Sequence, residues 1–330
     1  MKLKNFILLA LVFFTIESFG GELDRAIELY LDDDFAAAHK IVSAPAFSQS
    51  GRAWYLMSML VLKPGSPFKD PTKVIEYSEK SSRLGFPAAI SNLGTAALNG
   101  EWGAVDYAKA KVLLEKAAAL GDRNAHYGLA YMYEQGLEVE LSLPKSMALL
   151  ARGAELGDAE SAYKLGNLLR LYPEHSNGLS QFVLFKRAAD LGSASGAFMW
   201  ARACAEGEQI DRNLDEAYKG FKFAADAGLP LAQVNLGHFY QKGWGTQRNN
   251  LLAYKYYWLA SGNLQSADYQ LKNLTQALSQ SERAEAEEKK AQWKEEAQRA
   301  KKEIDSVNRR ESIMARWRND GPEVLKPSHE

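Results

Sequence analysis

The side chains that most often carry catalysis or bind metals are few and widely separated in this sequence. The five histidines are His39, His126, His175, His238 and His329. The sequence has no HExxH motif and no closely spaced histidine and cysteine pairs of the kind that bind zinc. The one cysteine, Cys204, cannot form an internal disulfide, and its place on an apolar helix face predicts a buried structural thiol. We therefore expect no metal and no cofactor.

Three serines precede a lysine by three positions, which is the spacing of the nucleophile motif in penicillin-recognising enzymes. They are Ser66, Ser142 and Ser161. The companion motifs SDN and KTG are absent, as are the phosphate-binding GxxxxGK[ST] and the nucleophile elbow GxSxG. Ser66 and Ser142 fall in expected turns, and Ser161 falls at a small packing position. We predict that the protein is not an enzyme, with a cell-wall or β-lactam-acting hydrolase as the alternative.

The bulk composition is that of a soluble globular protein. Of the 330 residues, 46% are hydrophobic and 25% are charged, and the net charge is −1. The basic residues form no stripe, so nothing attracts the chain to nucleic acid or to an anionic membrane surface.

The first twenty residues have the layout of a signal peptide. Lys2 and Lys4 precede an apolar run over 6–16, and Ser18 and Gly20 place small side chains before a cut after Gly20. An uncleaved N-terminal anchor is the alternative. No later segment has 18 consecutive apolar residues, so we expect no membrane span in the mature chain. The expected location is periplasmic or secreted, after cleavage near Gly20.

A glycine recurs after the end of an apolar helical stretch at nearly constant intervals. The spacings are 36, 36, 35, 36 and 34 residues, measured between Gly85, Gly121, Gly157, Gly192, Gly228 and Gly262. Positions four and nine residues after these glycines are small, which lets two helices approach closely. A glycine fifteen residues on is suited to ending a helix. Six residues later, Asp106, Ser142, Asn213 and Asn249, with Asn177 in a shortened unit, are suited to capping the next helix. Each period therefore predicts two antiparallel helices.

The pattern LG-x₃-A-x₃-LG-x₅-G resembles the Sel1-like repeat family, a relative of the tetratricopeptide repeats. The segments LGFPAAISNLGTAALNG (84–100), LGDRNAHYGLAYMYEQG (120–136) and AGLPLAQVNLGHFYQKGWG (227–245) carry the resemblance. It implies an all-α, right-handed α/α superhelical solenoid of helix-turn-helix repeats with a concave, protein-binding groove. Tyr172 and Pro173 replace a turn glycine, so we expect an irregular unit there.

We predict six segments along the chain. A signal peptide covers 1–20, N-terminal capping helices 21–48, a degenerate repeat 49–84, and Sel1-like repeats 85–262. A C-terminal capping and charged amphipathic helix covers 263–318, and a disordered tail covers 319–330.

The C-terminal helix carries a narrow apolar seam among many charges. From Ser281 to Arg318 there are 11 basic and 9 acidic residues. The seam consists of Trp293, Ala297, Ala300, Ile304, Val307 and Met314. It favours packing on the last repeat, with an extended solvated helix and a partner-docking helix as alternatives.

The first helix of each repeat lines the groove in this family, and its exposed stripe should lie 7, 10 and 14 residues after the opening glycine. We expect a partner protein to bind there, with a peptide or a surface component left open. The predicted partner-binding residues are Asn92, Thr95, Tyr131, Gln135, Lys164, Asn167, Met199, Arg202, Asn235, His238 and Lys242. The predicted function is an extracytoplasmic protein-protein interaction scaffold. Besides the hydrolase, the alternative is a structural spacer attached through its C-terminal helix.

Overall fold

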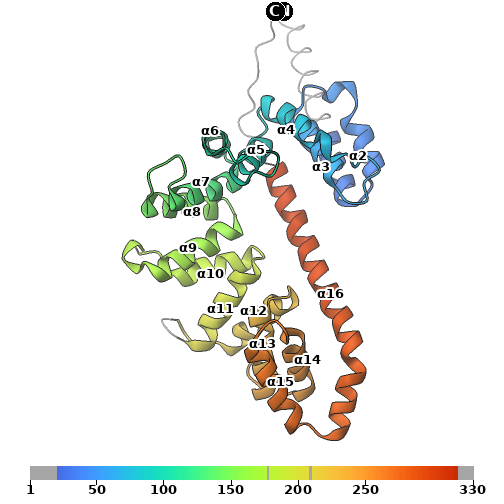
Figure 1. The fold of residues 1–330 in the computed structure, drawn as a ribbon, viewed down its shortest axis with the longest axis vertical. Helices are drawn as coiled ribbons and strands as arrows, with labels where there is room; N and C mark the ends of the chain where they lie inside the picture. The colour runs from blue at the N-terminus through green and yellow to red at the C-terminus, as the bar shows by residue number, and fades with distance from the viewer. Residues whose placement is uncertain (1–20, 177, 208–209, 319–330) are drawn as a thin grey trace, which may run out of the picture. The chain divides into compact units, whose positions relative to one another are not determined.

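The computed structural model describes residues 21–176, 178–207 and 210–318, and within these ranges the regular structure is helical throughout. The chain forms two compact units. Unit 1 contains the described residues up to Ser142 together with those from Ile313, and unit 2 is Leu143–Ser312. The predicted signal peptide and disordered tail lie outside the described residues. Figure 1 follows the helices in chain order by colour.

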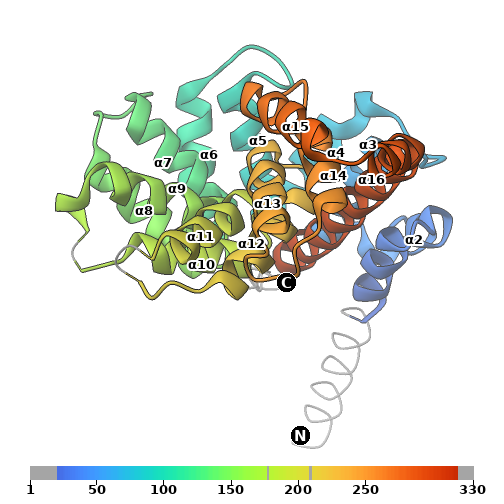
Figure 2. The ribbon, with the colours of Figure 1, turned by 90° about the horizontal axis from the view of Figure 1, so that it is seen from below.

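The repeats consist of alternating helices, here called A and B. The A helices are α5 (Pro87–Asn99), α7 (Arg123–Gln135), α9 (Ala159–Leu171), α11 (Ala194–Glu206) and α13 (Pro230–Lys242). The B helices are α6 (Tyr107–Ala119), α8 (Leu143–Glu155), α10 (Gln181–Asp190), α12 (Leu214–Asp226) and α14 (Asn250–Ala260). The last pair, α13 and α14, lies side by side in Figures 1 and 2. The predicted fold class, an all-α repeat solenoid, is confirmed.

Further helices precede and follow the repeats. In unit 1, residues 21–31 are helical, and α2 (Phe35–Val42), η1 (Pro45–Phe47), α3 (Gly51–Leu62), η2 (Pro71–Lys73) and α4 (Val74–Arg83) come next. In unit 2, α15 (Gln265–Ala277) follows the last B helix. The helix α16 (Gln280–Trp317) belongs to unit 2 through Ser312 and to unit 1 from Ile313.

The turn between an A helix and its B helix contains the predicted closing glycine and the predicted capping side chain. The A helix ends at a left-handed glycine, for example Gly136 with φ 67° and Gly243 with φ 73°, where a side chain would be strained. The side chains of Asp106, Asn213 and Asn249 then accept hydrogen bonds from the first-turn N–H groups of α6, α12 and α14.

The irregular unit lies where the glycine is missing. The helix α9 stops at Tyr172, and Pro173 begins the short η3 (Pro173–His175). Asn177 lies outside the described residues, and Ser180 caps α10 through a hydrogen bond from the Phe182 N–H.

The small residues predicted for the A helices bring the two helices of a repeat into contact. A Cβ placed on Gly166 of α9 would lie 2.7 Å from Cε1 of Phe185 in α10. Phe185 is only 1% exposed, so its ring has no open space to move into. The same relation holds between Gly237 of α13 and Tyr257 of α14. The glycine is therefore needed for the ring of the B helix to pack on the A helix.

We predict that Gly166→Ala destabilises the protein. Alanine in a helix interior normally stabilises the folded protein by about 0.5–1 kcal/mol relative to glycine. Overpacking a full core, however, destabilises it by about 1–3 kcal/mol. The overpacking term is the larger, so the unfolding midpoint in urea should fall. In a Phe185→Leu background the obstructing ring is absent, and the same Gly166→Ala change should cost much less. An equal cost in both backgrounds would show that the ring contact is not the reason for the glycine.

Candidate functional site

In unit 1 the predicted stripe is partly available to a partner. Tyr131 is 42% exposed on α7, and Gln135 in the last turn of that helix is also exposed. Thr95 and Asn92 on α5 are half-buried. The stripe therefore offers a phenol and an amide to solvent from α7.

Asn92 is engaged by the chain itself. One terminal nitrogen of Arg316 (Nη2) donates to Oδ1 of Asn92 at 2.9 Å and to the carbonyl oxygen of Ala88 at 2.9 Å. The Nε of Arg316 also donates to Oδ2 of Asp122 at 3.3 Å. Asp122 is 1% exposed, so its carboxylate depends on this guanidinium and on its own helix for compensation. Arg316 was not among the predicted site residues.

Trp317 anchors the same segment. Its side chain is fully buried in the core of unit 1, and its indole Nε1 donates to Oδ1 of Asp24 at 2.8 Å. The guanidinium of Arg52 lies 5.4 Å from the indole centroid, and Phe86 packs edge-on at 6.2 Å. The last turn of α16 is thus a structural element of unit 1 that combines a buried indole with a buried ion pair.

In unit 2 the predicted stripe divides into free and engaged residues. Lys242 is exposed, and Arg202 is partly exposed and forms an ion pair with Glu206 at 3.3 Å. Asn167 and Asn235 donate to backbone carbonyls of their own helices, and Lys164 is half-buried. Met199 differs from these, because it is only 9% exposed and belongs to the core. Placing Met199 on the exposed stripe was wrong: its flexible apolar side chain is covered by protein.

His238 is also engaged within unit 2. Its Nδ1 lies 2.9 Å from the hydroxyl oxygen of Tyr257, which in turn donates to Oε1 of Gln241 at 3.0 Å. Burial, with a smaller effect from the charge of Lys242, lowers the pKa of His238. A neutral imidazole therefore sits on this face of α13 at pH 7.

The side chains considered for catalysis have the surroundings of structural residues. Cys204 is buried, and burial, with a smaller effect from Glu216, raises the pKa of its thiol to about 11. Ser161 is fully buried, and its hydroxyl has no hydrogen-bond partner among the described residues. Ser66 accepts from the backbone N–H of Phe68, as a turn residue does. These contacts give no support to the hydrolase alternative.

The described residues show neither a candidate metal cluster nor a candidate membrane span. No group of three or more histidine, cysteine, aspartate or glutamate side chains is arranged to hold a metal ion. No described helix combines the length and the apolar character needed to cross a bilayer.

The repeated unit matches a known family. The model of the Sel1 repeat matches residues 87–122, 123–158, 159–193, 194–229 and 230–261, which together are more than half of the chain. The chain belongs to the Sel1 repeat family. Each matched unit begins at the start of an A helix, so the family repeat and the structural repeat coincide. Sel1 repeats typically mediate protein interactions.

Named relatives and a solved structure agree with this assignment. The chitin synthase regulator SKT5 of Saccharomyces cerevisiae is 30% identical over 210 residues, covering 59% of this chain and 30% of that protein. The protein of the same name from Malassezia restricta is 32% identical over 193 residues, covering 55% of this chain and 13% of that protein. The chain thus spans less than a third of either curated relative. A Sel1 repeat protein from Oxalobacter formigenes has 26% identity and a TM-score of 0.59, over 78% of this chain and 76% of that chain.

We predict that Arg316→Ala destabilises unit 1 by about 3 kcal/mol, because it leaves the carboxylate of Asp122 buried without its counter-charge. The matched control is Arg318→Ala, two residues on and exposed, which should change stability by less than about 0.5 kcal/mol. Hydrogen exchange read by mass spectrometry locates the effect: amides of α5 and α7 should exchange faster in Arg316→Ala alone. Equal exchange in the two variants would mean that the buried ion pair contributes little.

Proposed function

We propose that this Sel1 repeat protein is a scaffold that binds a partner protein through the exposed faces of its A helices. One observation carries the proposal. In each of the five repeats, the last A-helix residue before its cap is exposed, and the residue type differs each time: Asn99, Gln135, Leu171, Glu206 and Lys242. Positions that build the fold repeat their chemistry along this chain, whereas these positions vary. Variation at constant exposure is what a recognition surface requires.

The chemistry of the stripe supports protein recognition. Tyr131 in unit 1 and Arg202 in unit 2 are each of a side-chain type that is enriched at binding hot spots. Lys164 of α9 and Lys242 of α13 add positive charge to the A helices of unit 2, in which Arg202 of α11 pairs with Glu206. A partner segment that carries carboxylates complements the A-helix face of unit 2. A stable complex would need to cover about 800 Å² of it.

The curated relatives support a regulatory role. Both are named as regulators of chitin synthase. By that likeness, we infer that the partner is itself an enzyme, and that the repeats control the partner rather than perform a reaction. This inference rests on the part of those relatives that the chain spans.

The spacer alternative is less well supported by the contacts of α16. A spacer held by its C-terminal helix would present the end of that helix to a partner. The last turn instead places Trp317 and Arg316 in the core of unit 1. The A-helix faces remain the better candidates for the partner surface.

We further propose that the protein acts outside the cytoplasm. The basis is the pattern of residues 1–20, in which two lysines, an apolar run and small residues before a cut after Gly20 occur in the order of a signal peptide. This proposal is independent of the binding proposal.

We predict that charge reversal on the A helices of unit 2 abolishes partner binding. The variant Lys164→Glu/Arg202→Glu/Lys242→Glu places negative charge where an acidic partner would bind, so recovery in a pull-down from the native host should fall at least tenfold. The control is Lys186→Glu/Lys219→Glu/Lys222→Glu, which makes the same change in charge on the B helices α10 and α12. If both variants recover the partner as the unaltered chain does, the site lies elsewhere.

We predict that the mature protein begins at Gly21. Expression of the full chain in its native host, followed by N-terminal mass analysis, should yield a chain that starts at Gly21 in the periplasmic or secreted fraction. Replacing Gly20 and Ser18 by bulky residues should block processing, because signal peptidases require small side chains before the cut. A full-length chain in the cytoplasmic fraction would disprove the proposed location.

A further inference from the structure

A cavity opens in unit 1 outside the matched Sel1 repeats. Its volume is about 170 Å³. It is lined by residues of α2, α3, η2, α4 and the loop after α3, namely His39, Met57, Leu60, Val61, Phe68, Asp70, Lys73 and Tyr77. None of these residues belongs to the A-helix stripe, so the cavity is a separate feature of the N-terminal part of the chain.

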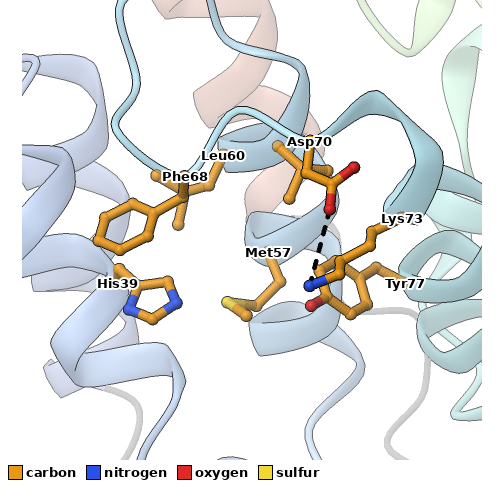
Figure 3. A pocket seen from close by; sticks show the side chains of 8 residues that line it. His39, Met57, Leu60, Phe68, Asp70, Lys73 and Tyr77 are labelled. Carbon is orange, nitrogen blue, oxygen red and sulfur yellow. Dashed lines mark ion pairs between the residues drawn. The ribbon is translucent and has the colours of Figure 1, made fainter.

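One wall of the cavity is a stacked pair of rings. The imidazole of His39 lies parallel to the ring of Phe68, with 3.9 Å between centroids and 10° between planes. Figure 3 shows this pair on one side of the cavity and Tyr77 on the other, with Met57 between them. Burial lowers the pKa of His39, so the imidazole is neutral at pH 7. The wall is therefore aromatic and uncharged.

The floor of the cavity is aliphatic, and its rim is charged. Leu60 is fully buried and Val61 is 4% exposed, while the thioether of Met57 reaches the same space (Figure 3). A methionine sulfur beside an aromatic ring is a favourable contact. At the rim, Nζ of Lys73 lies 3.7 Å from Oδ2 of Asp70, and these partly exposed charges balance each other. An apolar group would enter, and polar atoms attached to it would remain at the rim.

The size of the cavity limits what it can hold. A cavity of about 150 Å³ lined by apolar side chains accepts a benzene molecule. Sites for whole small ligands are larger, at about 300–1,000 Å³. A volume of 170 Å³ therefore suits a single ring attached to something that stays outside. Aromatic side chains that fill such pockets are typical anchors of protein interfaces.

We propose that this cavity binds one aromatic ring, the side chain of a phenylalanine or tyrosine on a partner protein. The ring lies against the His39–Phe68 wall and above Leu60, next to the methyl group of Met57. The partner backbone crosses the rim, where Lys73 and Asp70 meet its carbonyl and amide groups. This site goes beyond the function proposed for the A helices and does not depend on it.

The test uses the methyl group of Met57 as a reporter in the full chain. With ¹³C-methyl-labelled methionine, the Met57 signal is assigned by its loss in Met57→Leu. Titration with N-acetyl-phenylalanine amide should shift this signal saturably, with a Kd near 1 mM, equivalent to about −4 kcal/mol. N-acetyl-leucine amide should bind at least tenfold more weakly, and N-acetyl-lysine amide should leave the signal unchanged.

Variants of the wall decide whether the rings matter. Phe68→Leu keeps an apolar side chain but removes one ring, and it should weaken binding of the phenylalanine amide at least tenfold, as should His39→Ala. The matched control His175→Ala, in η3 of unit 2, should bind as the unaltered chain does. The other methionine signals verify that each variant is folded. An unshifted Met57 signal up to the solubility of the probe, or equal affinity for the leucine amide, would overturn the proposal.

Discussion

The structure depends on one constraint: a pair of helices cannot cover its own apolar face and must be covered by its neighbours. Inside the array the next pair provides the cover, and the regular spacing of the repeats follows from this. The ends need other solutions. In unit 1 the helical residues 21–31, α2 and Trp317 join one core. In unit 2 the core continues past the last matched repeat to Leu274 of α15 and Trp293 of α16. Elements outside the Sel1 match therefore share hydrophobic cores with the repeats and cover the apolar faces at the ends of the array.

What could be read from the sequence is what is local and repeated. A helix cap acts over three residues, and a glycine opposite a ring acts within one repeat. Both recur at a fixed position of the repeat in several periods. The caps Asp106, Asn213 and Asn249 and the close approach at Gly166 were predictable for this reason. The irregular turn at Tyr172 was also predictable, because the glycine expected at that position of the repeat is missing from the sequence.

The contacts of Arg316 and Trp317 could not be predicted in the same way. Trp317 meets Asp24, 293 residues earlier, and Arg316 meets Asp122, 194 residues earlier. These pairings do not recur with the period of the repeat. The available cue was an indole beside a guanidinium at the end of a helix otherwise rich in exposed charge. The seam prediction found Trp293, which is buried, but it also included Val307, which is 51% exposed. Helical spacing identifies a face of α16 and leaves open which parts of that face are covered.

The same distinction applies to the candidate site. Residues seven positions after the opening glycine share one place in the repeat, yet Asn92 binds Arg316, Met199 is buried, and Asn235 bonds to its own helix. Residues fourteen positions after it are exposed in every repeat. The difference is geometric: the earlier position lies in the middle of the A helix, within reach of side chains from other elements. The later one lies in the last turn, next to a C-cap glycine without a side chain in four of the five repeats and next to Tyr172 in the third. Recognition by this array should therefore be concentrated at the C-terminal turns of the A helices, where sequence can change without disturbing a contact that the fold requires.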